Sequence, residues 1–137
     1  MSDMLTTIFE RQLELQRSAF GIDPGALPLE QRVAYVDWNL TALGQELAEA
    51  RDEIAWKNWA SDYGTFINTP ELLGEMADAL HFFVNVLLAV DSTPEELYDA
   101  YTRKRAVNAR RQAEGYSHDS NKCPECGRAL DEPRLET

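Results

Sequence analysis

The chain has 137 residues and a mass of 15.5 kDa, which suffices for one compact domain but not for two full hydrophobic cores. Its formal net charge of -11 at pH 7 argues against nonspecific binding to nucleic acid or to an anionic membrane. No secretory signal is visible, and the longest apolar stretch (residues 80–90) is too short to span a bilayer, so we expect a cytoplasmic protein, in the host cytoplasm if a phage encodes it.

Apolar residues recur at helical spacing from the N-terminus onwards. The first stripe covers residues 5–20 and ends at a Gly-Ile-Asp-Pro-Gly turn. Pro28 suits the first turn of a second helix, because the N–H that proline lacks has no helical partner there. The apolar face of this second helix continues to about Trp59, a length that predicts a bend or a break, and residues 61–68 form a loop.

Two similar start signals open the remaining helices. Residues 69–71 (Thr-Pro-Glu) predict a helix start with a capping threonine, an early proline and an acidic first turn. Residues 92–96 repeat this signature and open a last helix that runs to about Glu114. Without an alternating strand pattern, the sequence predicts an all-α bundle of four or five helices over residues 1–116, followed by a flexible polar tail, residues 117–137.

Two acidic pairs lie on consecutive predicted helices: Glu46 with Glu49, and Glu75 with Asp78. The i, i+3 spacing places both carboxylates of a pair on one helix face. If the helices lie antiparallel, the four carboxylates converge and repel one another unless a cation binds among them. Oxygen ligands of this kind suit magnesium or manganese. The alternative is that these residues are ordinary surface charges on the solvated edges of their helices.

The acidic pairs belong to a longer pattern that resembles a known family. Three motifs follow one another in an order and spacing similar to those of the all-α nucleotide pyrophosphatases: Glu46-Leu-Ala-Glu49, Trp56-Lys57-Asn58-Trp59 and Glu75-Met-Ala-Asp78-Ala-Leu-His81-Phe82. The run from residue 101 to 116, with its Lys, Asn and Arg-Gln, is similar to the last motif of that family. Within the family the chain is most similar to the dimeric dUTPases, including short phage versions, and more distantly to MazG-like enzymes.

This resemblance implies a metal-dependent hydrolase. Glu46, Glu49, Glu75 and Asp78 match the carboxylates that hold two or three magnesium ions in the family, with manganese as a possible replacement. Glu49, supported by Glu46, would orient or deprotonate a water for in-line attack on the α-phosphate. The expected reaction is hydrolysis of a deoxynucleoside triphosphate, with dUTP as the expected substrate, to dUMP and pyrophosphate.

The resemblance also implies a pocket for the base and the sugar. Phe82 matches the aromatic residue that packs against deoxyribose and excludes a 2′-hydroxyl, and Asp78 matches a contact to the 3′-hydroxyl. Gln12 matches the glutamine that binds uracil, whereas Gln16 stands where an asparagine is expected. This departure leaves dCTP or a broader set of nucleotides open as substrates, and both glutamines have the alternative of a surface position.

Four polar residues are implied as further substrate contacts. Lys104, Asn108 and Arg111 fall at i, i+4 and i+7 on one face of the last helix, as a phosphate- and sugar-binding edge requires. Lys57 is a further candidate for a phosphate contact. The alternative for the basic residues of the last helix is a solvated helix end, where positive charge is favourable in any case.

A separate motif lies in the tail. Cys123-Pro-Glu-Cys126-Gly127 is typical of a zinc knuckle, and His118 is a third possible ligand. Because a closed site needs four ligands, two tails of the expected homodimer would complete it; a disordered tail or a redox-sensitive cysteine pair are the alternatives. A zinc knuckle also keeps a different class of function open, a non-catalytic helical interaction protein with a solvated acidic stripe.

Overall fold

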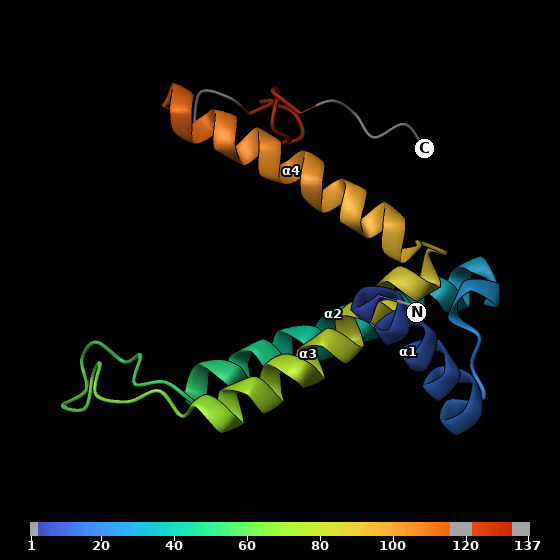
Figure 1. Cartoon of the computed structure of the whole chain (residues 1–137), viewed down its shortest axis with the longest axis horizontal. Coiled ribbons are helices and arrows are strands. Elements are labelled where there is room, and N and C mark those ends of the chain that lie inside the picture. Colours follow the sequence, from blue (N-terminus) through green and yellow to red (C-terminus); the bar gives the residue numbers. More distant parts are fainter. Residues whose placement is uncertain (1–2, 116–121, 133–137) are drawn as a thin grey trace. The chain divides into compact units, whose positions relative to one another are not determined.

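The described part of the chain, residues 3–115 and 122–132 of the computed structural model, is helical apart from loops, turns and isolated β-bridges. Its elements in chain order are α1 (Met4–Phe20), the short 3-10 helix η1 (Pro24–Ala26), α2 (Leu29–Asp52), α3 (Thr69–Ala89) and α4 (Pro94–Glu114) (Figure 1). The predicted all-α fold class is therefore confirmed.

The chain divides into two compact units, Met1–Pro94 and Glu95–Thr137. The first contains α1, η1, α2 and α3, and the second contains nearly all of α4 together with a small hairpin formed by residues 122–132. The expected domain of residues 1–116 includes parts of both units, and its independence from the tail stays a prediction.

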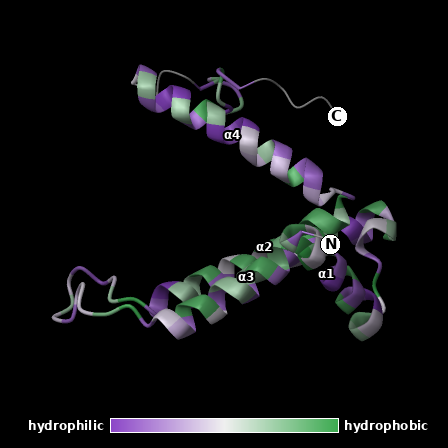
Figure 2. Ribbon diagram, in the orientation of Figure 1, coloured by the Kyte–Doolittle hydropathy of each residue, from purple (hydrophilic) through white to green (hydrophobic). Residues whose placement is uncertain are grey.

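The first unit is built around α3, which packs along α2 and also contacts α1 and η1 (Figure 1). Hydrophobic residues line α3 along most of its length (Figure 2), and Ala79, Val84 and Ala89 are buried. By length and composition alone α3 would be able to cross a membrane, a test that the core helix of a soluble protein also passes.

The helix α2 ends at Asp52 and not near Trp59, so the predicted C-terminus of this helix is wrong. The physical reason is pairing between the two ends of the α2–α3 loop. The Ala55 N–H donates to the Phe66 carbonyl over 3.1 Å, and the Asn68 N–H donates to the Glu53 carbonyl over 2.8 Å. These bonds need an extended backbone, which a continuing helix cannot provide.

The start of α3 also differs from the prediction. Asn68, not Thr69, occupies the N-cap, and no side chain caps the helix there. The Asn68 amide instead donates to a Glu53 carboxylate oxygen over 2.9 Å, which ties the start of α3 to the end of α2. Similarly, Pro28 takes the N-cap position of α2 and precedes its first turn.

The helix α1 brings polar side chains into the centre of the first unit. Asp3 caps its N-terminus by accepting from the Thr6 N–H over 2.9 Å, and Gly21 ends it with a φ of 65°, a conformation that favours glycine. Phe9, Gln12 and Gln16 follow one another at spacings of three and four residues on the buried face of α1. The apolar stripe that predicted this helix therefore also carries two buried amides.

Candidate active site

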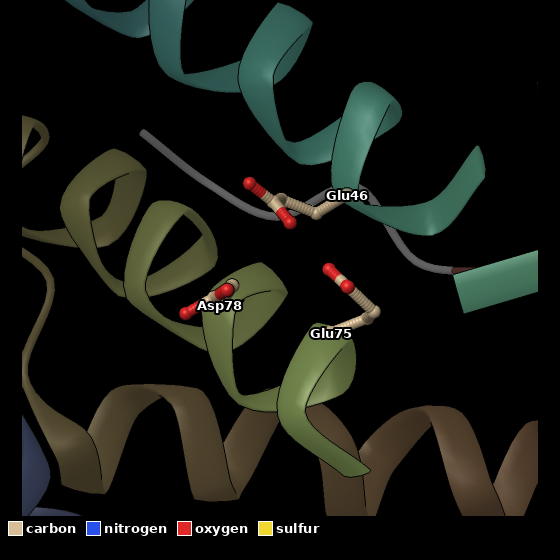
Figure 3. A group of neighbouring side chains, drawn as sticks. All are labelled: Glu46, Glu75 and Asp78. Atoms are coloured by element: carbon tan, nitrogen blue, oxygen red, sulfur yellow. The ribbon is translucent and has the colours of Figure 1, made fainter. Parts of the chain in front are cut away.

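Three carboxylates meet where α2 packs against α3. Glu46 projects from α2, and Glu75 and Asp78 project from α3 (Figure 3). One oxygen from each lies within 4.8 Å of the others. Glu46 and Glu75 are half-buried, whereas Asp78 is exposed. The i, i+3 spacing presents the two α3 residues together, and the packing of the helix pair brings Glu46 opposite them.

The electrostatics of this cluster are unbalanced without a cation. Burial raises the pKa of Glu75, and its hydrogen bond with Glu46 and the negative charges of Glu49, Glu46 and Asp78 raise it further. Glu46 Oε2 is buried and, among the buried side-chain atoms of residues 3–115 and 122–132, is the one without a hydrogen-bond partner. An oxygen-only donor set with an unpartnered buried oxygen fits a hard divalent cation such as magnesium.

Glu49 lies close to the cluster but outside the group of three. Its side chain is exposed and accepts a hydrogen bond from Gln45 Nε2 over 3.1 Å. Its charge nevertheless contributes to the raised pKa of Glu75. Of the four predicted metal ligands, the structure thus brings three together and leaves the fourth beside them.

A pocket of about 710 Å³ opens between α1, α2 and α3. Glu46, Asp78, Gln12, Gln16 and Phe82 are among the residues that line it. Five residues that the sequence analysis selected from three separate helices therefore share one cavity. The cavity therefore offers both carboxylates and amides to a ligand.

A chain of buried amides forms the polar floor of this pocket. Gln12 Nε2 donates to Asn85 Oδ1 over 2.7 Å, and Asn85 Nδ2 donates to Asn39 Oδ1 over 2.9 Å. Asn39 Nδ2 then donates to the Tyr35 backbone carbonyl over 2.8 Å. Because every amide in this series donates in the same direction, the Gln12 carbonyl oxygen remains the acceptor at the start of the chain.

Gln16, the second glutamine of the pocket, is held by Tyr35 of α2. The Tyr35 hydroxyl donates to Gln16 Oε1 over 2.8 Å, which leaves the Gln16 amide nitrogen as the donating end. Burial raises the pKa of Tyr35 to about 12, so the phenol stays protonated at neutral pH. Gln12 and Gln16 are each only 6% exposed, unlike surface glutamines.

An aromatic pair completes the pocket wall. The rings of Phe82 and Trp38 meet edge to face, with centroids 5.8 Å apart and an angle of 67° between their planes. Trp38 holds the ring of Phe82 from the α2 side, and both residues line the pocket.

The sequence analysis missed three pocket residues on α2, namely Tyr35, Trp38 and Asn39. Asn39 precedes Glu46 by seven residues and Tyr35 precedes it by eleven, so both lie on the helix face of Glu46. A polar residue at such a position in an apolar stripe is a usable signal for a buried hydrogen-bonding role.

Lys57 lies apart from this pocket. It is exposed in the α2–α3 loop and lines a separate cavity of about 340 Å³ with Asp52, Asp62 and their neighbours. Trp56 in the same loop packs under the guanidinium of Arg51, whose carbon is 3.7 Å from the ring centroid. The structure of the first unit therefore does not bring Lys57 to the carboxylates.

The basic residues of α4 are engaged by carboxylates of the hairpin. Arg111 donates from two nitrogens to the Asp131 carboxylate over 2.8 and 2.6 Å and also to Glu132 over 2.9 Å. Lys104 pairs with Glu132, and Asn108 is exposed on the same helix. The Arg111 side chain holds the pKa of Asp131 at about 2, and the pKa of Glu132 is lowered mainly by Lys104.

The predicted zinc ligands are described in part. Cys123 and Cys126 are free thiols in the hairpin, half-buried and exposed respectively, while His118 lies outside the described residues.

The chain is similar to known proteins in two comparisons. A family model described as dUTPase matches residues 4–96, which include the three converging carboxylates and all the pocket residues named above. A dCTP pyrophosphatase of Enterobacteria phage LZ5 is 29% identical over 83 residues; the match covers 53% of this chain and 48% of the relative, so the chain spans about half of that protein. No solved structure gives a significant match. Since the family model covers most of the chain and the whole of the pocket, this protein belongs to the dUTPase family.

Proposed function

We propose that this protein hydrolyses a deoxynucleoside triphosphate, with dUTP as the preferred substrate, to the nucleoside monophosphate and pyrophosphate. The observation that carries the proposal is the shared pocket, in which two of the three clustered carboxylates and two buried glutamines line one cavity. Membership of the dUTPase family and the similarity to a phage dCTP pyrophosphatase support the reaction class.

The reaction depends on magnesium in this proposal, with manganese as a substitute. Glu46, Glu75 and Asp78 would hold the ion, and Glu49 is proposed as a further ligand because its charge contributes to the raised pKa of Glu75. Bound there, the ion would neutralise the triphosphate and lower the pKa of the attacking water. Glu49 is the proposed residue that orients or deprotonates this water, with Glu46 beside it, because its carboxylate is exposed and outside the group of three.

The two glutamines are proposed to read the base. The Gln12 carbonyl accepts and the Gln16 amide donates, so together they match the N3–H of uracil and one of its carbonyl groups. Cytosine reverses this pattern, with an amino donor at C4 and an acceptor nitrogen at N3, so both amides would have to rotate to pair with it. The dCTP pyrophosphatase relative favours dCTP as the second candidate substrate. Phe82, held by Trp38, is proposed to pack on the deoxyribose.

Lys57, Lys104, Asn108 and Arg111 remain proposed triphosphate and sugar contacts, supported by the family resemblance alone. For Lys104 and Arg111 the hairpin carboxylates are competitors, because a carboxylate and a phosphate offer the same kind of anionic oxygen to a guanidinium or ammonium group.

The protein is also proposed to be a homodimer. Five apolar residues of α3 and its C-cap are exposed in the single chain and recur at spacings of three, four and seven residues, namely Leu73, Met76, Leu80, Phe83 and Val90. A stripe with this spacing is typical of a helix that packs against another helix. A second copy is the proposed cover, and Leu80→Glu combined with Phe83→Glu should give a monomer in analytical ultracentrifugation. A variant that keeps the mass of a dimer would contradict this interface.

The remaining expectations concern partners and location. We propose the cytoplasm, of a host cell if the protein is phage-encoded, and a small-molecule substrate without a nucleic-acid or membrane partner. The net charge of -11 supports this, because it repels polyanionic surfaces.

The test is product analysis by chromatography with purified protein and each of dUTP, dCTP, dTTP, dATP, dGTP and UTP, with and without magnesium. We expect dUMP and pyrophosphate from dUTP, little turnover of UTP, and none after chelation of the metal. Glu49→Gln should remove turnover. Asp52→Asn, which changes a neighbouring exposed carboxylate of the same helix, is the matched control and should retain turnover. Preference for dCTP would overturn the base assignment, and no turnover of any nucleotide would overturn the reaction.

A further inference from the structure

The hairpin of residues 122–132 has the local geometry of a metal-binding knuckle. Its two ends are joined by an antiparallel bridge between Lys122 and Ala129. The Cys123 N–H donates to the Arg128 carbonyl over 2.7 Å, and the Gly127 N–H donates to the Cys123 carbonyl over 2.8 Å. Gly127 has a φ of 68°, which lets the backbone reverse directly after the second cysteine.

This backbone aims polar hydrogens at one sulfur. The N–H groups of Cys126 and Glu125 donate to the Cys123 sulfur, and the Cys126 thiol is also within hydrogen-bonding reach of it. The two sulfurs therefore lie within reach of one another on a loop that its backbone hydrogen bonds fix, as a shared metal ion requires.

One chain does not offer enough soft ligands for a closed site of sulfur atoms. The whole sequence contains two cysteines and two histidines. His81 belongs to α3 in the first unit, where its Nδ1 is 2.8 Å from the Ala77 carbonyl oxygen. Structural zinc sites are four-coordinate and are made of cysteine and histidine, and the described hairpin offers only two such ligands, so two more must come from outside it.

We propose that the hairpin supplies half of a zinc site, and that Cys123 and Cys126 of a second copy of this chain complete a tetrahedron of four thiolates around one ion. Four thiol protons leave as the ion binds, so the site carries two negative charges. Lys122 and Arg128 lie at the base of each knuckle loop and balance them. The residues that line the nucleotide pocket do not include any residue of the hairpin.

The experiment uses the reduced full-length protein and measures the metal, not the turnover of nucleotide. We expect about 0.5 zinc ion per chain by elemental analysis after dialysis, since two chains share four ligands. Cobalt titration of the zinc-free protein should give a thiolate-to-cobalt charge-transfer band and tetrahedral d–d bands that saturate at the same ratio. Cobalt at the carboxylate cluster would not contribute to the charge-transfer band, because its ligands there are oxygens.

Two variants separate this site from its alternatives. Cys123→Ser combined with Cys126→Ser should lose the charge-transfer band while the far-ultraviolet circular dichroism stays unchanged, because the helices do not depend on the hairpin sulfurs. His118→Ala should keep both the band and the ratio. One ion per chain, with loss of binding in His118→Ala, would overturn the shared site, as would the absence of a thiolate band from the reduced protein. An intramolecular disulfide that forms in place of metal binding would do the same.

Discussion

Asn39 gives the sharpest test of the pocket, because it lies at the centre of the amide chain and is only 1% exposed. Replacement by alanine removes its two hydrogen bonds, one from Asn85 and one to the Tyr35 carbonyl, and leaves the Asn85 amide without this acceptor. A buried polar group left unpaired costs about 1–3 kcal/mol, and the lost bond to Tyr35 adds about 1 kcal/mol. We therefore expect Asn39→Ala to lower the free energy of unfolding by about 2–4 kcal/mol.

The assay is urea denaturation followed by circular dichroism, without nucleotide or metal. Thr41→Ala is the matched control, because the Thr41 hydroxyl makes a comparable bond to the Asp37 carbonyl over 2.9 Å on the exposed side of the same helix. The control should change the unfolding free energy by less than about 0.5 kcal/mol. A similar loss in both variants would mean that the buried network has no special role in stability.

Asn39→Asp adds a pH test with a defined sign. The new carboxyl still accepts from Asn85, but it must be protonated to donate to the Tyr35 carbonyl. Its pKa in the folded protein should therefore lie above the unfolded value of about 3.9. A raised folded pKa means that stability is highest at low pH and falls as the pH rises through that pKa. A cost that does not change with pH would refute the assigned direction of these hydrogen bonds.

Three further predictions concern metal, substrate and specificity. Because the pKa of Glu75 is raised, the stability of the metal-free protein should fall as the pH rises from about 4.5. Magnesium should restore this stability in thermal melts. Glu75→Gln should flatten the pH dependence of stability and remove the stabilisation by magnesium. Asp131→Asn combined with Glu132→Gln removes the carboxylates that pair with Lys104 and Arg111, so KM for the nucleotide should fall by roughly 2–10-fold with little change in kcat. A higher KM would contradict the proposal that these carboxylates compete with the phosphates. Gln16→Leu removes the amide that Tyr35 holds and that is proposed to donate to the base, so kcat/KM for dUTP should fall by roughly tenfold in steady-state assays. An unchanged kcat/KM would remove Gln16 from base recognition.

Residues close together in the sequence determined the helices and the faces they present. The apolar periodicity of α1 and the Thr-Pro-Glu start of α3 indicated helices whose observed bounds differ by only a residue or so, because helical hydrogen bonds join residues four apart. The spacing of Glu75 and Asp78 placed both on one face for the same reason. Motif resemblance then selected Gln12 and Phe82, which the structure places in one pocket.

Contacts between distant residues decided the rest. Only the packing of α2 against α3 brings Glu46 to Glu75 and Asp78, while Glu49, although it is one turn along the same helix, stays outside the group. The hydrogen bond between Gln12 and Asn85 joins residues 73 positions apart, and no local pattern specifies it. The same holds for the end of α2, because the bridge between Ile54 and Ile67 stops a helix that periodicity alone would continue. Local propensity sets which faces exist, whereas burial and hydrogen-bond satisfaction across the fold decide which of these faces meet.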